Sequence, residues 1–108
     1  PGMKTRFRAL HDYTAKLPLC AATESEELAG LTTRQAIELG VMNGIAFEIE
    51  GYAARMRSQI EDLCVIFTGG DANFFVKRIK NTIFANCNLV FCGLNRILEY
   101  NASEEHLN

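Results

Sequence analysis

The feature that most constrains the fold is an apolar run that ends in a glycine turn. Residues 63–68 (Leu-Cys-Val-Ile-Phe-Thr) carry no charge and are rich in β-branched and aromatic side chains. A run of this length and composition predicts a buried strand. Gly69, Gly70 and Asp71 follow directly, and paired glycines at the end of an apolar run indicate a tight turn.

A helical pattern and a second short apolar run come after this turn. Residues 72–82 predict a helix with apolar side chains on one face, and residues 88–91 predict a second strand. A final helix is predicted over 94–100, followed by a polar tail over 101–108 that frays. Two strands joined by a helix predict a right-handed β-α-β crossover, and therefore an α/β fold with a parallel pair. Since stable sheets need three or more strands, we expect others from a longer chain or from neighbouring molecules.

The first half of the chain predicts two further helices. Apolar side chains at helical spacing over 4–16 predict the first, which Pro18 would stop. The longest helical pattern starts at Thr32 and extends to about residue 62. Thr32 is a suitable N-cap, and Gln35 three residues later completes a capping box.

A stripe of small residues follows this long helix. Ala36, Gly40 and Gly44 recur at every fourth position and therefore share one face. Each glycine inside a helix costs about 0.5–1 kcal/mol relative to alanine, so close packing must offset the loss. The stripe packs either against another part of the same domain or against a second subunit. Gly40 and Gly44 are our candidates for a dimer interface.

Composition and charge exclude several classes of protein. Hydrophobic residues make up 48% of the chain, as in ordinary globular domains, and 11 basic against 13 acidic residues give a net charge of −2. This balance of charges does not favour binding to nucleic acid or anionic lipid. No apolar run approaches the ~20 residues of a membrane helix. Four cysteines without a C-x-x-C pair indicate reduced, mostly buried thiols in a cytoplasmic protein. With two histidines in the chain, we predict no metal site.

Two places are candidates for binding chemistry. A Gly69–Gly70 turn before a helix exposes backbone N–H groups that suit a phosphate, although such a turn is often structural, with Asp71 as a simple N-cap. Thr33, at the head of the long helix, could donate to a carboxylate or phosphate, or serve the helix end alone. His11 beside a ligand pocket could donate a hydrogen bond. No catalytic triad, zinc motif or P-loop is present.

Five blocks of the sequence, in order, resemble the type III pantothenate kinases, also known as Bvg accessory factor-like proteins. The blocks are Pro1-Gly2 with Arg6-x-x-Ala9-Leu10-His11-x-x-Thr14-Ala15-x-Leu17-Pro18, Gly30-x-x-Thr33-x-x-Ala36-Ile37-x-x-Gly40-x-x-x-Gly44, Ile49-Glu50-Gly51, Thr68-Gly69-Gly70-Asp71-Ala72, and Asn88-Leu89-Val90 with Gly93-Leu94 and Tyr100-Asn101.

The resemblance implies an actin-like ATPase (ribonuclease H-like) fold, of which this chain would be a partial C-terminal lobe. It implies ATP-dependent phosphorylation of pantothenate, the first step of coenzyme A synthesis, by a homodimer that uses Mg²⁺ and a monovalent cation (K⁺ or NH₄⁺). Thr33 then matches a threonine that contacts pantothenate, and His11 a histidine that lines that pocket. Gly69 and Gly70 match the loop that approaches the nucleotide. Asp71 is not carried over as a catalytic residue.

The departures from the family pattern are informative too. The family's D-x-G-N-T phosphate motif and the G-A-D-R segment with the catalytic aspartate do not occur in these 108 residues. We therefore expect this polypeptide alone to be inactive. Leu39 stands where the family often has a small residue. The alternatives are an inactive accessory or regulatory protein of the same fold, and an unrelated α/β module.

Overall fold

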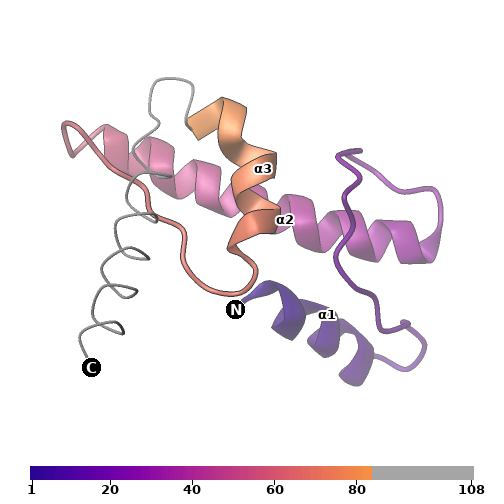
Figure 1. Ribbon diagram of the computed structural model, residues 1–108. Helices are drawn as coiled ribbons and strands as arrows, with labels where there is room; N and C mark the ends of the chain where they lie inside the picture. The colour runs from indigo at the N-terminus through magenta and orange to yellow at the C-terminus, as the bar shows by residue number, and fades with distance from the viewer. Residues whose placement is uncertain (84–108) are drawn as a thin grey trace, which may run out of the picture. The chain divides into compact units, whose positions relative to one another are not determined.

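The computed structural model describes residues 1–83, and three helices account for most of this part (Figure 1). They are α1 (Met3–Asp12), α2 (Thr33–Arg57) and α3 (Ala72–Ile83). The chain divides into two compact units, residues 1–51 and 52–108. The predictions of a strand over 88–91, a helix over 94–100 and a frayed tail over 101–108 lie outside the described residues.

Helix α1 is shorter than the predicted range of 4–16, because it ends locally and well before Pro18. The Tyr13 N–H donates to the Ala9 carbonyl at 2.9 Å, and the Thr14 hydroxyl donates to the Leu10 carbonyl. The first is an ordinary i→i−4 helical bond, and in the second a side-chain hydroxyl takes the carbonyl that the Thr14 N–H would bind if the helix continued. Helix termination is therefore decided by the residues after Asp12 and not by the proline, and this part of the prediction was wrong.

The start of α2 confirms the predicted capping box. The Gln35 N–H donates to the Thr32 hydroxyl at 3.1 Å, and the Gln35 side-chain oxygen accepts from the Thr32 N–H at 3.3 Å. The helix ends at Arg57, five residues before the predicted end at 62. Ser58 Oγ donates to the Arg55 carbonyl at 2.6 Å, and Asp62 has a left-handed φ of 57°. Both features show that the chain has left the helical conformation between residues 58 and 62.

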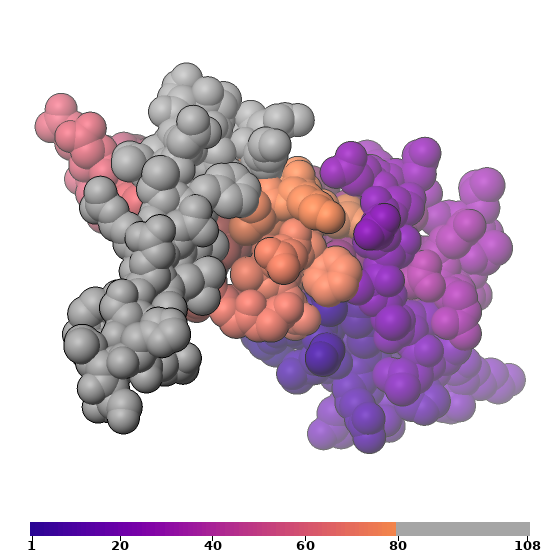
Figure 2. Space-filling model, in the orientation of Figure 1, coloured from indigo at the N-terminus to yellow at the C-terminus, as the bar shows by residue number. Residues whose placement is uncertain are grey.

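The loop between α1 and α2 lies on the surface of the first unit, where Figure 2 shows it in purple. It is anchored to the middle of α2 by the Asn43 side-chain amide, which donates to the Glu27 carbonyl at 2.8 Å. Its Cys20 side chain is buried, and Arg34 of α2 lies 3.8 Å from that sulfur. The loop is therefore held against the N-terminal half of α2.

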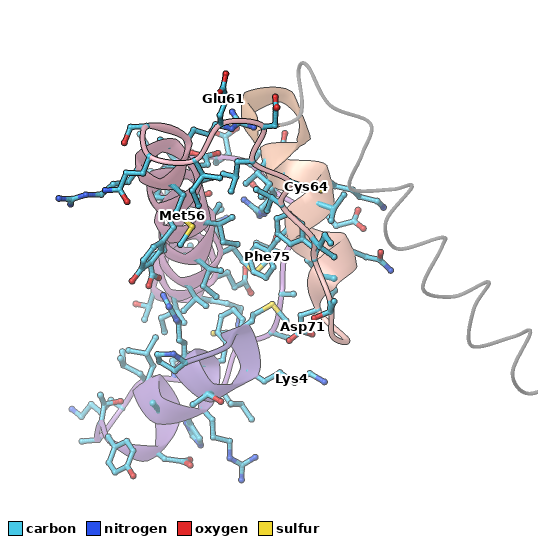
Figure 3. The ribbon with its side chains drawn as sticks, turned by 90° about the vertical axis from the view of Figure 1, so that its left-hand side faces the viewer. Lys4, Met56, Glu61, Cys64, Asp71 and Phe75 are labelled. Atoms are coloured by element: carbon cyan, nitrogen blue, oxygen red, sulfur yellow. The ribbon has the colours of Figure 1, made fainter. Side chains whose placement is uncertain are left out.

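The second unit confirms the predicted helix after the glycine turn. Helix α3 begins at Ala72 as expected, and Phe75, Val76 and Ile79 are buried. Figure 3 labels Phe75 on this helix. This face was predicted from apolar spacing alone, because a helix beside a core buries residues three and four apart.

The predicted buried strand over 63–68 is not formed in the described part of the chain. These residues are in neither a helix nor a strand, and their side chains alternate between half-buried and exposed. Cys64, Ile66 and Thr68 are on the exposed side. A strand needs a neighbour to complete its hydrogen bonds, and residues 1–83 contain no other strand. The apolar run predicted burial, but burial of both faces depends on elements that the run itself does not specify.

Candidate functional site

The candidate site in the first unit is an open groove between α1 and α2, with a volume of about 690 Å³. Its walls are largely apolar and consist of Ala9, Leu10 and Leu17 on one side and Ala36, Ile37 and Val41 on the other. Arg6 and Thr33 are the polar side chains of the lining. The groove therefore presents a hydroxyl and a guanidinium to a ligand that is otherwise in contact with hydrocarbon.

Two adjacent threonines at the head of α2 have different roles. The Thr32 hydroxyl accepts a hydrogen bond from the Gln35 N–H at 3.1 Å, so it caps the helix. Thr33 is one position further along the helix, where its exposed side chain lines the groove. The capping role of Thr32 is therefore confirmed, and a contact between Thr33 and a ligand stays a prediction.

Gly30 is a positioning residue that composition and motif spacing left without a role. A Cβ atom at this position would lie 2.5 Å from the Ala36 backbone nitrogen and 2.5 Å from the Gln35 backbone carbon. Real Cβ atoms do not approach backbone atoms this closely, so the loop can lie against the first turn of α2 because residue 30 has no side chain. The sequence signal that could have indicated this role is the position of Gly30, three residues before Thr33 at the start of α2.

His11 borders the groove without lining it. Its side chain is exposed, and Nδ1 lies 2.8 Å from the Leu17 carbonyl oxygen. Because a carbonyl only accepts, this bond requires the proton on Nδ1, which leaves Nε2 as an acceptor in the neutral ring. Leu17 itself lines the groove, so His11 supports one wall from behind.

An ion pair joins the two helices beside the groove. Arg6 of α1 pairs with Glu48 of α2, and Arg6 Nε also donates to the Pro1 carbonyl at 2.9 Å. The hydrogen bond to Glu48 raises the pKa of Arg6, and the same bond lowers the pKa of Glu48. Sequence reasoning missed this pair, because the partners lie far apart in the chain and follow no helical spacing.

The two glycines of the small-residue stripe have different surroundings. Gly40 is exposed and lines the groove, and a Cβ there would meet nothing within 4 Å. Gly44 is half-buried, and a Cβ there would lie 3.9 Å from Arg6 Nη1. Gly44 therefore faces α1 of its own chain, whereas the surface at Gly40 is open.

The glycine turn lies in the second unit. Gly69 has a φ of 97°, a conformation that side chains with a Cβ rarely adopt. The Ala72 N–H donates to the Gly69 carbonyl at 3.3 Å, and the Phe74 N–H donates to the Asp71 carbonyl at 3.2 Å. The turn thus uses two of the first N–H groups of α3 internally. That this turn and Thr33 face a common cleft stays a prediction.

Replacing Gly69 by alanine is expected to destabilise the protein by about 1–2 kcal/mol, because of its positive φ. Gly70 is the matched control, since its φ is not positive and a Cβ there would meet nothing within 4 Å. We expect Gly70→Ala to change the free energy of unfolding by less than about 0.5 kcal/mol. Urea unfolding of both variants measures the difference, and equal effects would show that backbone conformation does not matter at this turn.

The remaining chemistry-bearing residues form no cluster in the described part. Among residues 1–83 there is no group of three or more His, Cys, Asp or Glu side chains that could hold a metal ion. Cys20 is a buried free thiol, as predicted, but Cys64 is an exposed one, which corrects the expectation for that residue. Cys87 and Cys92 lie outside the described residues. None of the described helices has the length and apolar character needed to span a membrane.

Comparison with known proteins places these residues in a family context. The family model described as "Type III pantothenate kinase" matches residues 1–55. A type III pantothenate kinase of Flavobacterium psychrophilum is 50% identical over 100 residues, which are 93% of this chain and 42% of that protein. Those of Flavobacterium johnsoniae (44% over 100 residues; 93% and 41%) and Cytophaga hutchinsonii (46% over 101 residues; 94% and 43%) are also similar. The chain thus spans about two fifths of the length of these curated relatives. No solved structure matches it significantly.

Proposed function

Because the chain belongs to the type III pantothenate kinase family, we propose that the complete protein phosphorylates pantothenate with ATP as the phosphoryl donor. This reaction is the first step of coenzyme A synthesis. The observation that carries the proposal is the family match over residues 1–55, which contain both walls of the groove between α1 and α2. Family membership also rules out the alternative of an unrelated α/β module.

The family has the actin-like ATPase fold, and this chain is proposed to form part of its C-terminal lobe. In this proposal residues 63–68 and 88–91 are the two strands of a β-α-β unit within a larger sheet. The alternating exposure of residues 63–68 supports it, since this is the pattern of a segment that pairs within a sheet. The rest of that sheet would come from parts of the protein outside these 108 residues.

In the proposed enzyme the groove binds pantothenate. Its volume of about 690 Å³ lies within the ~300–1,000 Å³ of ordinary small-molecule sites. Pantothenate has an apolar dimethyl centre with hydroxyl, amide and carboxylate groups around it, which fits apolar walls with a hydroxyl at one end. Thr33 supplies that hydroxyl, and His11 at the rim is the second substrate residue.

Gly69 and Gly70 are proposed to approach the nucleotide. The positive φ of Gly69 supports a backbone path that brings main-chain atoms close to a ligand without an intervening side chain. Mg²⁺, when bound, neutralises charge on the phosphoryl groups, and a monovalent cation is proposed as a further requirement. No cluster in residues 1–83 suits either ion, so we assign no residue of this part to them.

A homodimer is proposed for the complete protein. Gly40 is exposed in the lining of the groove, so a second subunit there would border the substrate site, and the same helix exposes further apolar side chains, among them Phe47 at 55%. Exposed aromatic side chains that share a helix with an open glycine support a surface that a second subunit covers. Gly44 was the other candidate for this interface, but it is half-buried and faces Arg6 of its own chain, so the proposal rests on Gly40. We place the enzyme in the cytoplasm, where reduced thiols such as those of Cys20 and Cys64 are expected.

The test of function is the conversion of pantothenate to 4′-phosphopantothenate by the complete gene product, followed with labelled pantothenate, ATP and Mg²⁺. We expect turnover by the complete protein and none by the 108-residue chain, in which the D-x-G-N-T and G-A-D-R motifs do not occur. Product formation by the short chain would contradict this assignment of the catalytic groups. A complete protein that folds and binds pantothenate without turnover would instead be an accessory or regulatory member of the family.

A further inference from the structure

We propose that Arg6, held by Glu48, is a positioning residue that fixes the alignment of α1 and α2 and thereby the affinity of the groove for pantothenate. The inference rests on the proposed function, but its structural part can be tested separately. Arg6 is the residue that both lines the groove and carries an ion pair across to the opposite helix.

The two helices on either side of the groove have opposite directions. Figure 1 shows α1 and α2 running in opposite directions, and Arg6, early in α1, pairs with Glu48 in the second half of α2. The groove lining includes Arg6 of this ion pair and, on α2, Thr33 at the first residue of the helix.

Two kinds of contact hold α1 against α2. The helix has ten residues, of which Met3 and Phe7 are its buried side chains. Apolar attraction is non-directional, and two buried side chains constrain the rotation and the register of a short helix less than an extended packed face would. A charge-assisted hydrogen bond is directional, and the Arg6–Glu48 bond can therefore set both.

The guanidinium of Arg6 is confined by its neighbours. Arg6 Nε donates to the Pro1 carbonyl at 2.9 Å, while its terminal nitrogen meets Glu48. Gly44, one turn before Glu48, would place a Cβ 3.9 Å from Arg6 Nη1, so a longer side chain there would displace the group. The Arg6 side chain is 24% exposed, which leaves it little freedom beyond these contacts.

The chain offers a matched control on the same helix. Arg8 pairs with Asp12 at 3.4 Å, but both residues belong to α1, and Arg8 is 71% exposed. Replacing Arg8 therefore removes the same charge and an ion pair from α1 without removing a contact to α2. Any effect of net charge or of helix stability is shared by Arg8→Met and Arg6→Met.

The experiment compares Arg6→Met, Arg8→Met and the charge-reversed Arg6→Glu/Glu48→Arg in the complete gene product. For Arg6→Met we expect KM for pantothenate to rise about fivefold, with kcat within about twofold, because a partly exposed ion pair has an effect of this order. The charge-reversed protein should recover most of the affinity, and Arg8→Met should resemble the wild type. Added salt should raise KM in the wild type and leave Arg6→Met nearly unchanged.

Methyl NMR gives a readout that does not depend on catalysis. The methyl groups of Ala36 and Val41 line the groove and should shift in Arg6→Met, return in the charge-reversed protein and stay unshifted in Arg8→Met. If these methyls do not respond, if KM is unchanged, or if Arg8→Met has the same effect, the proposal is overturned. A wild-type protein that lacks kinase activity while its methyls respond as expected contradicts the proposed function and leaves the positioning of the groove by Arg6 supported.

Discussion

Gly30→Ala is expected to destabilise the protein by about 3 kcal/mol, which lowers the ratio of folded to unfolded molecules more than a hundredfold. The added Cβ would lie 2.5 Å from the Ala36 backbone nitrogen and 2.6 Å from the Gln35 Cβ. A flexible side chain could move aside at low cost, but backbone atoms in the first turn of a capped helix cannot. Relief therefore requires the loop to leave α2 or the capping box at Thr32 to open.

The measurement is the urea midpoint of Gly30→Ala, compared with Gly51→Ala as the control. Gly51 lies in the interior of α2, is exposed, and would meet nothing within 4 Å if a Cβ were added. The same substitution there should stabilise the helix by about 0.5–1 kcal/mol. Opposite signs are expected from the same chemical change. Equal midpoints for the two variants would mean that the loop does not lie against α2 in solution.

Thr33→Ala is expected to lower kcat/KM for pantothenate by about 10- to 100-fold in the complete protein, the loss expected when a hydrogen bond to a polar substrate is removed. Thr33 is exposed in the groove, so its replacement should leave the free energy of unfolding nearly unchanged. Thr33→Ser keeps the hydroxyl and should retain most of the activity.

Thr32→Ala is the control for this variant, because it removes the same hydroxyl from the adjacent residue. Its hydroxyl accepts from the Gln35 N–H, so the variant should lose about 1 kcal/mol of stability. Its kcat/KM should stay within about threefold of the wild type once both proteins are assayed well below their unfolding temperatures. If the two threonines exchanged these phenotypes, the assignment of Thr33 to the substrate would be wrong.

Local sequence signals predicted the helices where the deciding contacts are short in range. The capping box of Thr32 and Gln35 and the start of α3 after the glycine turn were both predicted correctly. The end of α1 was missed, because the Thr14 hydroxyl takes the Leu10 carbonyl, an interaction that helical periodicity does not contain. Pro18 was the more conspicuous residue, but the helix had already ended at Asp12.

In the candidate site, too, contacts between residues close in sequence could be predicted and contacts between distant residues could not. Thr33, a predicted substrate residue, lines the groove, and His11, the other, is hydrogen-bonded to Leu17 of the groove lining; both substrate roles stay predictions. Arg6 gave no sign of its pairing with Glu48, since the two residues are neighbours only after α1 has folded back along α2.

By itself, the sequence determined where α2 and α3 begin, which face of α3 is buried, and the family to which the chain is similar. These properties depend on side chains within a few positions of one another, and an unfolded segment already carries them. The tertiary structure alone decided that Gly30 must be glycine, that Thr33 and not Thr32 faces the groove, and that Arg6 of the groove lining pairs with Glu48 of the opposite helix. Those properties arise from distances between residues that are remote along the chain, and such distances exist only once the helices have packed.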